Sequence, residues 1–152
     1  MIAGRLHGRR SVEHAAAMHV DGRCHCGAIT FEAEVDPETT GICHCADCQA
    51  LTGTAFRVTV RAPAERFVLH GKPTVYVKTA DSGRKRAHAF CPTCGAPVYA
   101  TSAENPTAYS LRLGLIHQRK ELRPRRMSWC ASALPWSMNL ETLGLEEYDR
   151  QP

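Results

Sequence analysis

The chain has 152 residues, 43% of them hydrophobic and 7% aromatic, which allows a single domain with a modest core. Its net charge of +4 is a mild excess, and no aromatic residues alternate with the basic runs as a nucleic-acid stacking surface would require. The N-terminal stretch lacks the apolar core of a signal peptide, and no segment is apolar for the length of a membrane span. We therefore expect a cytoplasmic protein with neither membrane nor nucleic acid as partner.

Residues 1–19 show neither strand alternation nor an apolar face, and we expect a flexible N-terminal tail there, ahead of a domain over residues 20–152. From Ile29 onward, apolar and polar residues alternate in short runs that end at glycine, proline or aspartate. The predicted strands cover residues 29–35, 56–61, 67–69, 75–77, 87–90, 98–99 and 109–113. Residues 45–51 indicate about one turn of helix, so the pattern predicts a mainly β domain.

Seven of the eight cysteines fall into three tight clusters. The clusters are Cys24-His25-Cys26, Cys43-His44-Cys45-Ala46-Asp47-Cys48 and Cys91-Pro92-Thr93-Cys94. Spacings of one or two residues let two thiolates bind one metal ion, and zinc prefers four such ligands in a tetrahedron. Disulfides are the alternative, but they suit exported proteins, for which the sequence carries no signal. Four ligands complete one site and three remain, which is the number typical of a catalytic zinc with an open position.

Spacing alone permits several groupings of these cysteines. Cys24 and Cys26 can share a metal with Cys45 and Cys48, or with the pair at 91 and 94. The second grouping accounts for every clustered cysteine and keeps Cys43 with its neighbours. A histidine, His25 or His44, is an alternative fourth ligand for the triplet, although each lies between two cysteines and is expected to point away.

Five motifs in this order resemble those of the glutathione-dependent formaldehyde-activating (GFA) family. They are Gly22-Arg-Cys-His-Cys-Gly-Ala-Ile29, Cys43-His-Cys-Ala-Asp-Cys48, Thr52-Gly53, Phe90-Cys-Pro-Thr-Cys-Gly95 and Ser132-Ala-Leu-Pro-Trp136. The resemblance implies an Mss4-like fold of several coiled antiparallel β-sheets held by zinc, with two zinc ions per chain. It also implies that Cys24, Cys26, Cys91 and Cys94 bind a structural zinc, and that Cys43, Cys45 and Cys48 bind the catalytic zinc.

The same resemblance implies a carbon–sulfur lyase similar to S-(hydroxymethyl)glutathione synthase. Its partners would be a small thiol such as glutathione and formaldehyde or another small aldehyde. A zinc with three thiolate ligands suits this chemistry because it can hold a further thiol as an oriented nucleophile. The alternatives are a zinc-stabilised binding module without turnover, or a carrier of the adduct.

The remaining notable residues carry simpler expectations. Cys130 is expected to be a small buried residue, and Trp129 and Trp136 to lie in the core or a pocket wall. Asp47 is expected to cap the backbone locally. The basic runs at 84–86 and 119–126 are expected to be solvated loops, with attraction of an anionic small molecule as an alternative. Three histidines show no partner in the sequence and carry no special role: His70, His88 and His117.

Overall fold

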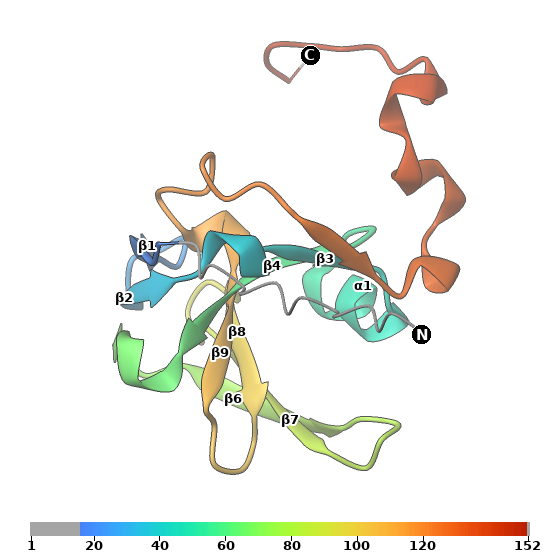
Figure 1. Ribbon diagram of the computed structural model, residues 1–152. Coiled ribbons are helices and arrows are strands. Elements are labelled where there is room, and N and C mark those ends of the chain that lie inside the picture. Colours follow the sequence, from blue (N-terminus) through green and yellow to red (C-terminus); the bar gives the residue numbers. More distant parts are fainter. Residues whose placement is uncertain (1–15, 152) are drawn as a thin grey trace, which may run out of the picture.

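The computed structural model describes residues 16–151 and is mainly β, as predicted (Figure 1). The strands are β1 (Met18–Arg23), β2 (Thr30–Val35), β3 (Gly41–Cys43), β4 (Arg57–Pro63), β5 (Phe67–His70), β6 (Thr74–Thr79), β7 (Lys85–Phe90), β8 (Pro97–Ser102), β9 (Ala108–Arg112) and β10 (Arg126–Ser128). The α-helix within the described residues is α1 (Ala46–Thr52). No helix in this part of the chain has the length and apolarity to span a membrane.

The strands form two sheets. Three of them pair antiparallel in the order β1-β2-β5. The other seven follow the order β10-β3-β4-β9-β8-β7-β6, in which every pair is antiparallel except β10 with β3. The mainly β, Mss4-like class is therefore confirmed, with one parallel pair added at the edge.

The core lies between the small sheet and the middle of the large one. Phe31 and Val35 of β2 pack with Val60 of β4 and Leu111 of β9, and all four side chains are at most 1% exposed. An aromatic group closes one end of this core, where the Phe67 ring lies 4.6 Å from that of Tyr109 and 5.7 Å from that of Tyr99. Alternation with a period of two produces this arrangement because it places the apolar side chains of each strand on one face.

Each strand expected from alternation is present, and the helical turn expected at 45–51 is α1. Three strands were not predicted: β1, β3 and β10. Most of the tail expected over 1–19 lies outside the described residues, so the domain boundary stays a prediction. Beyond β10 the chain forms three short 3-10 helices, η4 (Cys130–Ser132), η5 (Pro135–Met138) and η6 (Leu140–Leu143), and runs away from the sheets (Figure 1).

Candidate metal centres

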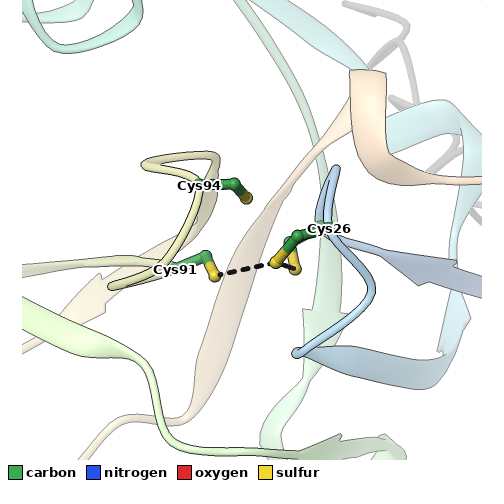
Figure 2. Close-up of side chains that lie close together, drawn as sticks. Cys26, Cys91 and Cys94 are labelled. Carbon is green, nitrogen blue, oxygen red and sulfur yellow. Dashed lines mark hydrogen bonds between the residues drawn. The ribbon is translucent and has the colours of Figure 1, made fainter.

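Four cysteines from two distant turns meet between the sheets. Cys24 and Cys26 come from the β1–β2 turn, and Cys91 and Cys94 from the β7–β8 turn. All four sulfur atoms lie within 4.8 Å of one another, with 3.6 Å between Cys24 and Cys26 and 3.7 Å between Cys26 and Cys91 (Figure 2). A tetrahedral zinc with bonds of about 2.3 Å would separate its sulfurs by about 3.8 Å, so this group fits such an ion.

The local backbone conformation brings these four sulfur atoms together and supplies hydrogen-bond donors to them. Gly27 and Gly95, each directly after a cysteine, have φ values of +81° and +73°, which glycine adopts readily. The Ile29 amide donates to the Cys24 sulfur at 3.2 Å. Hydrogen bonds from the backbone of Ala96 and Cys26 lower the pKa of the Cys94 thiol to about 6. These donors favour the thiolate form that a metal requires.

The second group comprises Cys43, Cys45 and Cys48, whose sulfurs also lie within 4.8 Å of one another. Cys43 ends β3, Cys45 is the N-cap of α1, and Cys48 lies in the first turn of that helix. The Cys45 and Cys48 sulfurs are 3.1 Å apart, and the Cys48 amide points at the Cys45 sulfur. Hydrogen bonds, led by that from the Cys45 backbone, lower the pKa of the Cys43 thiol against the effect of burial, whereas burial and the hydrogen bond with Cys45 raise the pKa of the Cys48 thiol.

Neither histidine of the sequence motifs joins these groups. His44 is 1% exposed, packs its ring 5.5 Å from that of Phe56, and belongs to no ligand cluster among the described residues. His25 is exposed and likewise lies outside both clusters. Within residues 16–151, the triplet therefore has three protein ligands and no fourth cysteine, histidine or carboxylate.

A cavity of about 600 Å³ opens beside the triplet, and all three of its cysteines line it. Strand register explains which other side chains line the cavity, because residues paired across antiparallel strands lie on the same face of the sheet. Cys43 pairs with Arg57, Lys78 with Arg86, and Tyr76 with His88. One face of the large sheet therefore packs on the core, while the other carries the triplet and a row of basic side chains.

His88 and Arg112 lie side by side on this second face. Arg112 is 5% exposed, and its Nη2 lies 3.4 Å from Nδ1 of His88. Burial, and then the nearby cations led by Arg112, lower the pKa of His88 to about 4. Because a guanidinium can only donate, Nδ1 accepts and the neutral imidazole carries its proton on Nε2. Sequence reasoning missed both residues, since each looks like an ordinary polar position in a strand.

Several expectations for the other residues were wrong. Cys130 and Trp136 are exposed, with Trp136 51% accessible, because they lie in the segment that leaves the sheets. Trp129 is 63% accessible and lies outside the core, but it borders the cavity, which confirms the pocket-wall alternative for this residue. Asp47 forms an ion pair with Lys78 across the cavity instead of capping the backbone. His117, expected to lack a partner, contacts Asp21 at 2.6 Å.

The donor sets determine what each centre can do. Four sulfurs are enough for a tetrahedral metal ion, and an ion held here would tie the β1–β2 turn of the small sheet to the β7–β8 turn of the large one. Three sulfurs at a cavity leave one coordination position for a small molecule. Thiolate ligands are soft and select zinc or copper(I) over magnesium or calcium.

Comparison with known proteins agrees with this picture. The structure is similar to a crystal structure of a Rhodobacter sphaeroides protein, a structural genomics target, with 22% sequence identity and a TM-score of 0.55. The match covers 71% of this chain and 99% of that one. That likeness supports the fold. The family model described as glutathione-dependent formaldehyde-activating enzyme matches residues 19–132, which include both cysteine groups. The chain therefore belongs to the glutathione-dependent formaldehyde-activating family.

Proposed function

We propose that the protein is a zinc-dependent carbon–sulfur lyase that forms or cleaves the S-hydroxymethyl adduct of a small thiol with formaldehyde or a similar aldehyde. The observation that carries the proposal is the triplet of Cys43, Cys45 and Cys48 at a cavity of about 600 Å³, without a fourth protein ligand in residues 16–151. Family membership supports the choice of a glutathione-like thiol and formaldehyde.

In this proposal the two cysteine groups have different tasks. Cys24, Cys26, Cys91 and Cys94 hold a structural zinc, and the triplet holds the catalytic one. When bound at the triplet, zinc would supply a coordination position at which a substrate thiol loses its proton. The chain's own residues fix the three sulfurs on β3 and α1 and enclose the cavity in which the aldehyde meets the thiol.

The reaction balances without an oxidant or reductant. A bond forms between the thiol sulfur and the aldehyde carbon, the C=O double bond becomes a C–O single bond, and the thiol proton ends on that oxygen. Cleavage is the reverse. The protein's contribution is mainly proximity, because two dissolved molecules become one complex. We propose that the reaction takes place in the cytoplasm.

Cobalt substitution followed by thiol titration tests this function. Glutathione should shift the cobalt absorption bands of the wild-type protein and leave those of Cys45→Ser unchanged. Exchange of formaldehyde with the adduct, followed by NMR, should be faster with protein than without it. A band shift without faster exchange would indicate a carrier, and no shift with any small thiol would refute thiol binding at the triplet.

A further inference from the structure

The cavity beside the triplet is strongly basic. Four cationic side chains line it, and two anionic ones. The cations are Arg57, Lys78, Arg84 and Arg86, and the anions are Asp47 and Asp81. The Lys78–Asp47 ion pair removes one charge of each sign. The sequence placed Arg84 and Arg86 in a solvated loop, but Arg86 is a half-buried residue of β7 whose side chain borders this cavity.

Two of the arginines have buried guanidinium nitrogens without a hydrogen-bond partner, and neither has an anionic partner among the described residues. Arg112 is 5% exposed, and its Nε and Nη1 have no hydrogen-bond partner. The same two nitrogens of Arg57 are buried and unpartnered. The ion pairs formed within residues 16–151 include neither of these arginines, nor Arg86. Burying a guanidinium without an anion is costly, so these groups indicate a negatively charged ligand.

The metal centre alone does not neutralise this charge. Counting Arg112 behind the wall, five cations and two anions give a local charge of +3. A zinc ion with three thiolates adds −1, and a bound substrate thiolate adds another −1, which leaves +1. One carboxylate would complete the neutralisation, whereas a phosphate dianion would exceed it.

The hydrogen-bond donors on this face of the sheet also favour a carboxylate ligand. Nδ1 of His88 accepts from Arg112, so Nε2 carries a proton and remains free to donate to a ligand in the cavity that His88 lines. Arg57 and Arg86 add guanidinium donors on the same face of the sheet. A planar guanidinium matches a carboxylate through two parallel hydrogen bonds.

From these contacts we propose that the cavity is a carboxylate subsite, in which His88, Arg57 and Arg86 bind a carboxylate carried by one of the two reactants. Arg112 is a positioning residue that fixes the His88 tautomer. The inference rests on the proposed thiol–aldehyde function and deepens it, because it assigns a charge to the substrate. The carboxylate can belong to the thiol or to the carbonyl compound, and the two sources are separable by experiment.

The thiol source is tested on cobalt-loaded protein with two probes of similar size, mercaptoacetate and 2-mercaptoethanol. Mercaptoacetate should bind at least about tenfold more tightly, as expected for charge-assisted hydrogen bonds. The ratio should fall toward one in Arg86→Gln and stay unchanged in Arg123→Gln, an exposed arginine far along the chain from the cavity strands. A preference that persists in both Arg86→Gln and Arg57→Gln would come from chelation of the metal and would count against the subsite.

The carbonyl source is tested with glyoxylate against glycolaldehyde, with 2-mercaptoethanol bound first. A tenfold preference for glyoxylate that Arg86→Gln abolishes would assign the carboxylate to the carbonyl compound. A preference in the mercaptoacetate experiment alone would assign it to the thiol. Equal binding of charged and neutral probes in both experiments refutes the subsite.

A third measurement remains decisive even if no thiol binds. Acetate is titrated at low salt into zinc-loaded protein, and the arginine Nε–H signals of Arg57 and Arg86 are followed by NMR. Saturable shifts that are lost in His88→Gln support the subsite, even where an unchanged cobalt spectrum has refuted thiol activation. The absence of saturable shifts refutes the subsite, whatever the thiol experiments show.

Discussion

Removing one pair of cysteines from each centre should reveal which centre holds the fold together. Both centres contain a Cys-x-x-Cys pair, so the double variants Cys91→Ser/Cys94→Ser and Cys45→Ser/Cys48→Ser make the same chemical change. The first breaks a link between Cys26 and Cys91, which are 65 residues apart. The second breaks a link that spans only the short segment from Cys43 to Cys48.

The two losses can be compared through the entropy of closing a loop. Treating each metal link as a cross-link, a 65-residue loop corresponds to about 4 kcal/mol of stability, and a loop of about five residues to about 2 kcal/mol. Because domains of this size are stable by about 5–15 kcal/mol, the first loss is a large fraction of the total. Each pair contains one buried cysteine, Cys91 at 0% and Cys48 at 2% exposed. The cost of burying a serine hydroxyl is therefore similar in the two double variants and largely cancels when their stabilities are compared.

Urea unfolding of zinc-loaded protein, followed by circular dichroism, measures these differences. The exposed Cys130→Ser is the control and should unfold like the wild type. Zinc content is measured on each variant, so that a change in stability is assigned to the centre that lost its metal. An equal or larger loss in Cys45→Ser/Cys48→Ser would refute the division into a structural and a catalytic centre.

Three further outcomes are expected. Zinc-supplemented protein should contain two zinc ions per chain, with the ion at the cavity-lining triplet removed first by a chelator; elemental analysis that stays at one ion would contradict this. Gly22→Ala should lower the free energy of unfolding by about 1–3 kcal/mol, because the added Cβ would lie 2.5 Å from both the Leu115 oxygen and the Phe31 ring. The control Gly114→Ala adds a Cβ that meets nothing within 4 Å, so its melting temperature should be close to that of the wild type. Burial and neighbouring cations lower the pKa of His88 from 6.5 to about 4, so the unfolded chain binds a proton between these values that the folded chain does not. Stability should therefore fall by about 1.3 kcal/mol between pH 7.5 and pH 5.5, and urea titrations of His88→Gln should lack this part of the loss.

The sequence predicted the strands that alternate strongly and missed those that do not. Residues 29–35 and 56–61 alternate over at least six positions, so their pattern is clear without any tertiary information. The β3 strand has only three residues, and β10 lies in a run of arginines whose pairing with β3 depends on a distant segment. Trp129 and Trp136 look like core residues by composition, yet the core between the sheets is filled without them.

The cysteine groups were accessible to sequence reasoning because ligand spacing is local, while the cavity wall was not. Arg57, Arg86 and Arg112 occupy polar positions of three alternating strands, and alternation assigns such positions to solvent. It separates two faces of a strand but does not say that another element closes over the second face. Here α1 and the triplet lie against that face, so side chains that look solvated in the sequence instead surround a ligand cavity. The row of basic side chains beside the cysteine triplet is therefore visible only after strand pairing places Arg57 opposite Cys43 and the sheet brings Arg112 beside His88.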